Sequence, residues 1–226
     1  MRSLFAREIT SLAEINKDIV LLSGDIGNKM FDGFKEIAKD RFFNCGIAEA
    51  NMMSMASGMA LTGLRPYIYT ITPFTTTRCL EQIKIGAAYH NSNVVIIGTG
   101  SGLSYSELGP THHSLEDIAI LRSIPEIRIL TPSDPIELKA ILRETINIDG
   151  PSYIRIGKKG EPNLHDESSD LGIGKAKLLV EGKDVLILAI GPIVSEAIKA
   201  VREDTSNDKS VAIATMSSIK PLDEEF

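Results

Sequence analysis

Short apolar runs alternate with segments of helical periodicity along most of the chain. The run Val94–Ile97 is apolar and β-branched throughout, which is typical of a strand covered on both faces. Such runs predict strands at residues 18–22, 41–45, 65–71, 93–98, 126–130 and 152–156. Helical periodicity predicts helices between them, at residues 3–16, 48–61, 78–89, 115–123 and 135–146. This alternation predicts an α/β fold built on a doubly wound, mostly parallel sheet.

The segment Ser133-Asp134-Pro135 has the composition of a helix start. Asp134 suits the N-cap, because its carboxylate can accept a backbone N–H, and Pro135 suits the first turn. In doubly wound sheets, ligands gather at the loops that follow the carboxyl ends of the strands. Those loops are therefore the expected place for functional residues.

The alternation breaks in a polar stretch that begins at Lys158, and we interpret residues 161–172 as an interdomain linker. A first domain then spans residues 1–160, and a second α/β pattern begins at 173–226. In this second part, strands are predicted at 175–180, 184–190 and 211–216, with a helix at 193–201. So few elements make a poor core for a free-standing domain, and we expect this domain to be incomplete.

Composition and charge exclude several classes of protein. The chain has 226 residues, of which 43% are hydrophobic and 24% charged, as in ordinary globular proteins. Its net charge of −6 argues against non-specific nucleic-acid binding. Residues Met1–Glu8 do not form a signal peptide, and no window approaches the ~20 apolar residues of a membrane span. We expect a soluble, cytoplasmic protein with no nucleic-acid or membrane partner.

The cysteines and histidines do not indicate a metal site. Cys45 and Cys79 lack CxxC or CxxH spacing, which argues against both zinc and a disulfide framework. His112 and His113 are adjacent, so their side chains point apart, and no third ligand is evident. We therefore assign no metal ligand to this chain.

Several short motifs follow the predicted strands in order. They are Gly24-Asp25-Ile26-Gly27, Cys45-Gly46-Ile47-Ala48-Glu49, Pro73-Phe74, Gly109-Pro110-Thr111-His112-His113 and Thr131-Pro132-Ser133-Asp134. Together they resemble the pyrimidine-binding domain of the transketolase family, which includes transketolases, 1-deoxyxylulose-5-phosphate synthases and the β subunits of 2-oxo acid dehydrogenases. The resemblance covers about residues 1–160. The remainder, with Ser218-Ile219-Lys220-Pro221-Leu222-Asp223, is similar to the start of that family's C-terminal domain.

Glu49 stands at a predicted strand-to-helix turn, where an acid can simply complement the helix dipole. The resemblance implies a catalytic role as well. In the family, the matching glutamate hydrogen-bonds N1′ of the aminopyrimidine of thiamine diphosphate and so activates the cofactor. A carboxyl group with that role needs a partly apolar pocket, in which it can hold or share a proton near neutral pH.

The resemblance implies two further cofactor contacts. Phe74 matches an aromatic that stacks on the aminopyrimidine, although it could also be a core aromatic at a strand end. Full-length transketolases carry several aromatics in this loop, whereas this chain has threonines at 75–77. Asp25 matches a position near the thiazolium, and as a loop aspartate it could equally cap a turn.

Three residues match positions that meet the substrate. His112 matches a histidine that donates to substrate hydroxyls or to the oxygen of the tetrahedral intermediate. His113 matches the double histidine of deoxyxylulose-phosphate synthases. Lys158 falls about where transketolases carry an arginine for the sugar phosphate, and Arg155 is a nearby alternative. Transketolases also carry sugar-binding groups where this chain has Gly100 or Ser101 and Leu108, so the usual pentose phosphates are in doubt.

The chain has no Gly-Asp-Gly segment, with which the family holds the Mg²⁺ of the cofactor diphosphate. The resemblance therefore implies a partner subunit of transketolase N-terminal type that carries this half of the site. We predict the C-terminal subunit of a split transketolase, self-associated in an α₂β₂ assembly, that transfers a two-carbon ketol unit from a ketose phosphate to an aldehyde. The alternatives are a deoxyxylulose-phosphate synthase-like carboligase subunit, a non-catalytic assembly subunit and, less well supported, a 2-oxo acid dehydrogenase β subunit.

Overall fold

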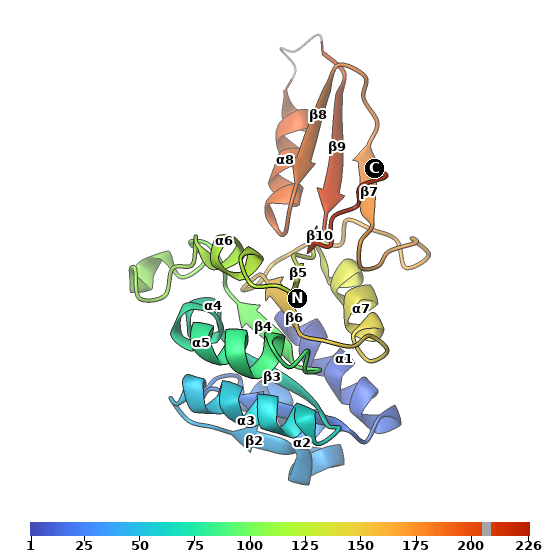
Figure 1. Ribbon diagram of the computed structural model, residues 1–226. Coiled ribbons are helices and arrows are strands. Elements are labelled where there is room, and N and C mark those ends of the chain that lie inside the picture. The colour runs from blue at the N-terminus through green and yellow to red at the C-terminus, as the bar shows by residue number, and fades with distance from the viewer. Residues whose placement is uncertain (205–208) are drawn as a thin grey trace.

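The computed structural model describes residues 1–204 and 209–226. Its main body is a seven-stranded sheet in the order β10-β5-β6-β4-β3-β1-β2 (Figure 1). The strands are β1 (Ile19–Ser23), β2 (Phe42–Asn44), β3 (Arg65–Ile71), β4 (Val95–Thr99), β5 (Arg128–Leu130), β6 (Ser152–Ile156) and β10 (Ser218–Lys220). All pairs are parallel except β10 with β5, which is antiparallel. The predicted doubly wound, mostly parallel sheet is confirmed.

Each face of this sheet carries its own apolar core. In β1, Leu21 packs toward one core and Leu22 toward the other, because successive strand residues point to opposite faces. The first face is covered by α1 (Arg2–Ile15), α2 (Asp32–Ala38) and α7 (Pro135–Glu144). The second is covered by α3 (Glu49–Leu61), a helical segment at 77–88 and α6 (Asp117–Arg122). Burial on both faces explains why the central strands are almost wholly apolar.

The predicted helix at 78–89 is wrong in its geometry. The segment consists of a 3₁₀ turn, η3 (Thr77–Cys79), a short α5 (Leu80–Gln82) and a π-helical stretch, η4 (Ile83–Ala88). A Cβ on Gly86 would lie 2.7 Å from Ser57 Oγ in α3, so the wider turn runs directly against that helix. Close packing of this kind is not visible in apolar periodicity.

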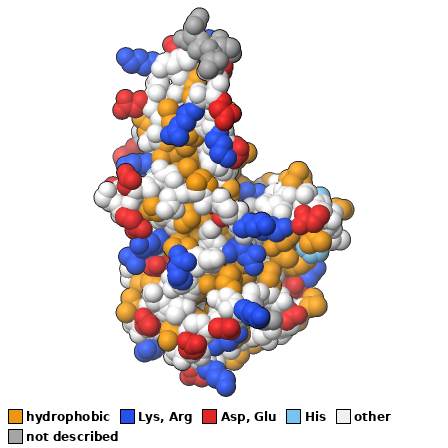
Figure 2. Space-filling model, turned by 180° about the vertical axis from the view of Figure 1, so that it is seen from behind, with side chains coloured by type: hydrophobic (Ala, Val, Ile, Leu, Met, Phe, Trp, Pro, Cys, Tyr) orange, Lys and Arg blue, Asp and Glu red, His pale blue; other side chains and the backbone are white. Residues whose placement is uncertain are grey.

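A second sheet stands above the main body (Figure 1). It contains β7 (Ala176–Val180), β9 (Val211–Met216) and β8 (Val185–Ala189) in that order, with α8 (Ile193–Glu203) packed on it. Leu186 and Leu188 of β8 are 52% and 51% exposed, so this small sheet leaves apolar surface uncovered. Apolar side chains are visible on this protruding part in Figure 2. The linker expected at 161–172 falls between β6 and β7.

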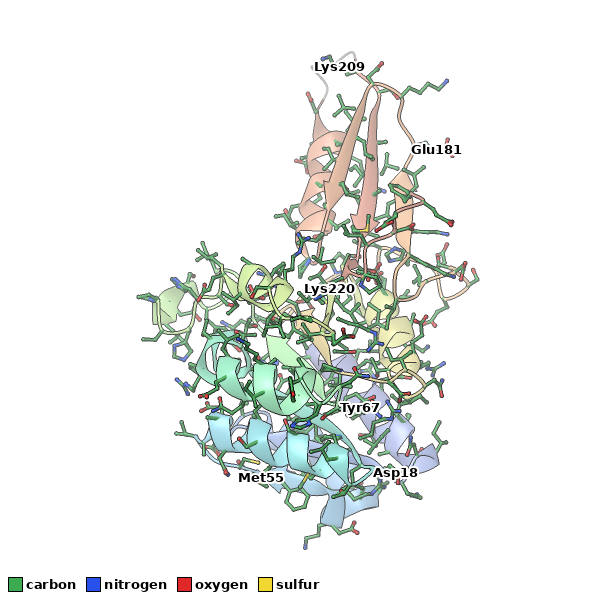
Figure 3. The ribbon with its side chains drawn as sticks, in the orientation of Figure 1. Asp18, Met55, Tyr67, Glu181, Lys209 and Lys220 are labelled. Atoms are coloured by element: carbon green, nitrogen blue, oxygen red, sulfur yellow. The ribbon has the colours of Figure 1, made fainter. Side chains whose placement is uncertain are left out.

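The chain then returns to the first sheet, which the sequence pattern did not predict. After β9, Ser217 O accepts the Thr131 N–H, and β10 pairs with β5. Lys220, which lies between the two sheets in Figure 3, donates from Nζ to the Ile124 carbonyl at 2.6 Å. A three-residue strand is too short to produce a pattern, so only the tertiary structure reveals it.

Within the described residues, no helix combines the length and the apolar character needed to cross a membrane.

Candidate active site

The loops that follow β1, β2, β3 and β4 meet at one edge of the main sheet. These strands are neighbours and run parallel, so their carboxyl ends lie together. Glu49 follows β2, Phe74 follows β3 in the helical turn α4 (Thr72–Thr75), and His112 lies in the long loop after β4. The fold therefore gathers three of the predicted site residues in one region.

Glu49 is the first residue of α3, and its side chain is only 3% exposed. Room for it comes from Gly24, at the carboxyl end of β1. A Cβ there would lie 3.4 Å from Glu49 Cγ and 3.1 Å from Thr70 Cβ. The carboxylate is thus enclosed at the sheet edge, with Oε2 accepting a hydrogen bond from Arg78 Nη1 at 2.8 Å.

Arg78 joins two of the predicted site residues. While one of its nitrogens donates to Glu49, its Cζ lies 4.0 Å from the centroid of the Phe74 ring. The two side chains meet although Phe74 lies in α4 and Arg78 in η3, because the chain turns at Thr76 between these two short segments. We did not assign Arg78 a role from the sequence, although a basic residue one turn after a candidate aromatic is a readable signal.

The ring of His112 also packs against Phe74. Its centroid lies 5.2 Å from that of Phe74 at an interplanar angle of 68°, an edge-on contact. His112 Nδ1 lies 2.9 Å from Thr111 Oγ1, and the Tyr105 ring is 6.2 Å away. This loop thus brings an imidazole to the candidate stacking aromatic.

An open cleft of about 380 Å³ lies beside these residues. It is lined by Pro73, Phe74, Thr77, Arg78, Pro110, Thr111, His113 and Glu116. An aromatic face, a guanidinium, an imidazole and a carboxylate thus line one space. Such a set can hold a flat polar ring or a hydroxylated substrate.

Glu49 and His112 contact residues of this cleft but do not line it, and neither do Lys158 and Asp25. Lys158 Nζ donates to Glu107 Oε1 at 2.9 Å and lies 4.1 Å from the Tyr105 ring centroid. Asp25 is exposed, adopts a left-handed φ of 55° and accepts a hydrogen bond from Asn44 Nδ2 at 3.1 Å. Arg155, the alternative phosphate ligand, instead donates to the buried Asp117.

The residues present fit one half of thiamine diphosphate. An enclosed carboxylate and an aromatic side chain are what an aminopyrimidine ring needs for hydrogen bonding and stacking. Among the described residues that line the cleft, Glu116 is the only acid, so this lining lacks the oxygen-rich set that Mg²⁺ prefers. The site would therefore hold the ring but not the metal diphosphate.

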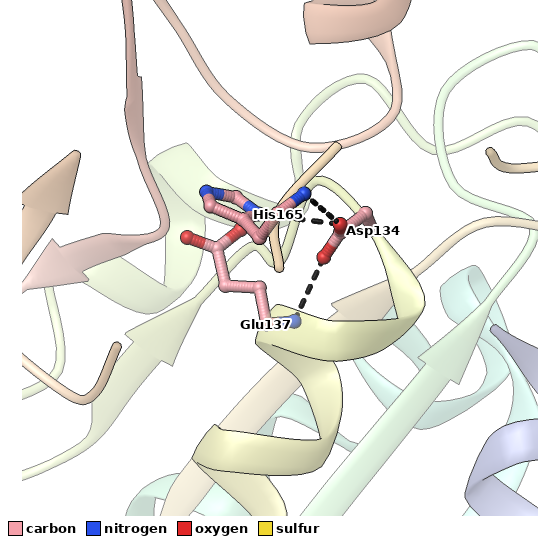
Figure 4. A group of neighbouring side chains, drawn as sticks. All are labelled: Asp134, Glu137 and His165. Carbon is pink, nitrogen blue, oxygen red and sulfur yellow. Dashed lines mark hydrogen bonds and ion pairs between the residues drawn. The ribbon is translucent and has the colours of Figure 1, made fainter. Parts of the chain in front are cut away.

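A separate buried cluster of Asp134, Glu137 and His165 lies beyond the end of β5 (Figure 4). Within the described residues, this is the group whose donor atoms could surround a cation. The sequence did not reveal it, because His165 lies about thirty residues after Asp134, in the segment 161–172 that we expected to be a linker. Asp134 Oδ1 accepts the Glu137 N–H at 2.7 Å, which confirms the predicted N-cap. Its Oδ2 accepts the N–H groups of Leu164 and His165 and lies 3.2 Å from His165 Nδ1. These bonds hold Leu164 and His165 against the start of α7.

Burial and charge shift the protonation of this cluster. Burial alone would lower the pKa of His165, but the contact with Asp134 and the charge of Glu137 outweigh it, and the net shift is upward. Burial alone would raise the pKa of Asp134, yet His165 and the backbone donors bring it below its ordinary value. Burial raises the pKa of Glu137. The protonated imidazole is thus favoured between two acids.

Comparison with known proteins gives a consistent result. The family model described as transketolase, pyrimidine binding domain, matches residues 1–161, and that of the transketolase C-terminal domain matches 174–226. The putative transketolase C-terminal section of Methanocaldococcus jannaschii is 35% identical, covering 100% of this chain and 72% of the relative. An apulose-4-phosphate transketolase subunit of Phocaeicola vulgatus is 33% identical over 99% of this chain and 72% of its own length. A solved split gene transketolase, described as an inactive beta4 tetramer, has a TM-score of 0.89 and 32% identity, covering 99% of this chain and 73% of that one.

Proposed function

The chain belongs to the transketolase family, and we propose that it is the C-terminal subunit of a split transketolase-like enzyme that uses thiamine diphosphate. The observation that carries this proposal is the enclosed Glu49 carboxylate, held beside Phe74 at the carboxyl edge of the sheet. Relatives named as split transketolase subunits support a division of the enzyme between two chains.

The surroundings of each candidate residue are compatible with a specific role in cofactor binding or catalysis. When bound, thiamine diphosphate supplies a nucleophilic carbon that attacks a substrate carbonyl. Glu49 would hold a hydrogen bond to the ring nitrogen of the aminopyrimidine and share its proton, protected from water by its burial. Phe74 would support the ring by stacking. Arg78, whose guanidinium lies over the Phe74 ring and bonds Oε2 of Glu49, would have to move off that ring for the stack to form.

The proposed reaction is transfer of a two-carbon ketol unit from a ketose phosphate to an aldehyde acceptor. His112, at the edge of Phe74, would donate a hydrogen bond to substrate oxygens, and His113 lines the adjoining cleft. Lys158 would bind the phosphate after leaving Glu107, since an ion pair to an exposed carboxylate holds the lysine only weakly. Asp25, on the loop after β1, would face the thiazolium side of the cofactor.

The diphosphate and its Mg²⁺ would be held by the partner subunit. The sequence contains no Gly-Asp-Gly segment, and the described cleft offers no cluster of hard oxygen ligands. We therefore propose an α₂β₂ assembly that is active only with a transketolase N-terminal-type partner. Self-association would occur through the pyrimidine-binding domain (1–160) or the C-terminal part (173–226), which flank the proposed linker at 161–172.

Reconstitution with the partner subunit tests the catalytic role of Glu49. Glu49→Gln keeps the side-chain shape but removes the ionisable carboxyl group, so we expect ketol transfer to fall by about 10²–10⁴-fold. Glu14→Gln, at an exposed position of α1, is the matched control and should keep full activity. Equal activity of the wild type and Glu49→Gln would disprove the catalytic assignment and favour a non-catalytic assembly subunit.

A second candidate function is carboligation of the deoxyxylulose-phosphate synthase type, with pyruvate as donor. The adjacent His112 and His113 favour it, since that double histidine is the pattern of those enzymes. The same reconstituted enzyme separates the two functions: release of CO₂ from pyruvate in the presence of an aldehyde would support carboligation, and turnover of a ketose phosphate without CO₂ would support ketol transfer.

A further inference from the structure

Asp117, at the start of α6, is a fully buried carboxylate that the proposed reaction does not use. Its Oδ2 accepts hydrogen bonds from the Tyr153 hydroxyl at 2.6 Å and from Arg155 Nε at 2.8 Å. The Arg155 side chain is 16% exposed, so most of this ion pair is shielded from water. Burial, followed by the charge of Asp117, raises the pKa of Tyr153 well above its ordinary value, and the hydroxyl stays a donor.

Stability alone does not account for this ion pair. Burying two charges carries a desolvation cost that their attraction repays only with good geometry and complete hydrogen bonding. Here Asp117 Oδ1 is buried without a hydrogen-bond partner in the described part of the chain, and so is Ser114 Oγ. An incompletely satisfied buried pair is better explained by what it holds in place than by the stability it adds.

What the pair holds is the end of the loop after β4. Arg155 Nη2 lies 3.4 Å from the carbonyl oxygen of Ser114. Ser114 and Gly102 exchange two backbone hydrogen bonds, of 2.9 and 3.1 Å, which close the loop between them. His112 lies inside this closed loop, two positions before Ser114.

The other end of the network reaches the segment that carries Phe74. A Cβ on Gly98 would meet both the Tyr153 hydroxyl, at 3.0 Å, and Thr72 Oγ1, at 3.1 Å, so these two groups border the same small space. Thr72 begins α4, and its hydroxyl donates to the carbonyl of Thr99. The network thus lies between the turn that carries Phe74 and the loop that carries His112.

From these contacts we propose that Arg155 and Asp117 are positioning residues that hold His112 against Phe74 by fixing the loop between Gly102 and Ser114. The catalytic consequence rests on the proposed function, since it assigns substrate contact to His112. The sequence had suggested Arg155 as a phosphate ligand, and its burial against Asp117 now favours a positioning role instead.

Histidine NMR on the full chain tests the proposal without any assay of activity. The chain contains four histidines, so the imidazole signals can be assigned by substitution. In Arg155→Met and Asp117→Asn we expect the His112 signals to shift or broaden, while those of the exposed His90 stay unchanged. Arg122→Met, which removes an exposed arginine from the same helix α6, is the matched control and should leave His112 unaffected. Unchanged His112 signals in both network variants would overturn the proposal.

Kinetics of the reconstituted enzyme separate positioning from phosphate binding. A positioning residue predicts a fall in kcat of roughly 10–100-fold for phosphorylated and unphosphorylated ketose donors alike, because the loop is displaced in both cases. A phosphate ligand predicts a higher KM for the phosphorylated donor alone, and that result would overturn the proposal. If Arg155→Met does not fold, Arg155→Lys can take its place, because lysine keeps the charge but loses the forked geometry. Its kcat should then lie below that of the wild type for both donors. If the wild type has no ketol transfer activity, the proposed function fails, and the NMR result alone decides the positioning role.

Discussion

Arg78 Nη1 donates a hydrogen bond of 2.8 Å to Oε2 of Glu49, so the enclosed acid of the candidate site already has a cationic partner from its own chain. The same guanidinium lies over the Phe74 ring. A flat, nitrogen-rich group therefore makes the two contacts that the proposed site would offer to an aminopyrimidine. This relationship makes Arg78 a competitor for the ring, and it leads to the first prediction.

Replacing Arg78 by Met should strengthen binding of thiamine diphosphate to the reconstituted enzyme by about 3–10-fold, since ~1.4 kcal/mol corresponds to a factor of ten. The variant leaves Glu49 without its hydrogen-bond partner, so the free energy of unfolding should fall by about 1–3 kcal/mol. Equilibrium binding and urea unfolding measure the two effects. Weaker binding would instead mean that Arg78 contacts the cofactor.

Phe74→Leu should weaken binding of thiamine diphosphate by about 2–10-fold, because an aromatic pair contributes ~0.5–1.5 kcal/mol beyond its buried area. Leucine keeps most of the apolar volume, so the unfolding midpoint should change little. Phe43→Leu, at a position 37% exposed on β2, is the control and should leave the affinity unaltered. An unchanged affinity in Phe74→Leu would exclude stacking at this residue.

Gly24→Ala should lower activity more than stability. The added Cβ would stand 3.1 Å from Thr70 Cβ and in contact with Glu49 Cγ at 3.4 Å, so Thr70 must shift by a few tenths of an ångström directly beside Glu49. Misplacement of about 1 Å can cost ~10²-fold in rate. Gly58→Ala in α3 is a useful control, because its Cβ would meet nothing within 4 Å and should stabilise the helix by about 1 kcal/mol. Equal kcat values for the two variants would contradict the proposed fit around Glu49.

From the buried cluster of Asp134, Glu137 and His165 we predict that the free energy of unfolding depends on pH. Because the folded pKa of His165 is raised, its contribution is fully present below the ordinary value of 6.5 and is lost as the pH rises through the folded value. Asp134 has a lowered pKa, so its contribution is present above 3.8 and is lost as the pH falls. Both contributions therefore operate together between about pH 4 and pH 6.5.

Urea unfolding of the wild type and His165→Asn across this range checks the prediction. The stability difference between them should be largest below about pH 6.5 and should shrink as the pH rises through the raised pKa of His165 in the folded protein. His90→Asn, at an exposed position, should show no such trend. A difference that stays constant with pH would mean that His165 acts through packing alone.

Much of the architecture follows from the order of residues along the chain. The runs at 65–71 and 152–156 coincide with β3 and β6, because a strand covered on both faces is predominantly apolar. Asp134-Pro135 marks the start of α7 for an equally local reason, since the cap bonds form within four residues. The placement of Glu49 directly after a strand is also local, and so is its position at the first turn of α3.

The sequence did not predict which residues from distant segments contact one another. The partner of Glu49 is Arg78, which follows a different strand, and Asp117, which follows β4, meets Arg155 of the neighbouring β6. Sequence alone predicted six of the seven strands of the main sheet, the family and the candidate acid, because periodicity and short motifs are read over a few residues. The tertiary structure decided which charges face one another, because the partners of a buried charge come from whichever segments the parallel sheet brings to the same edge.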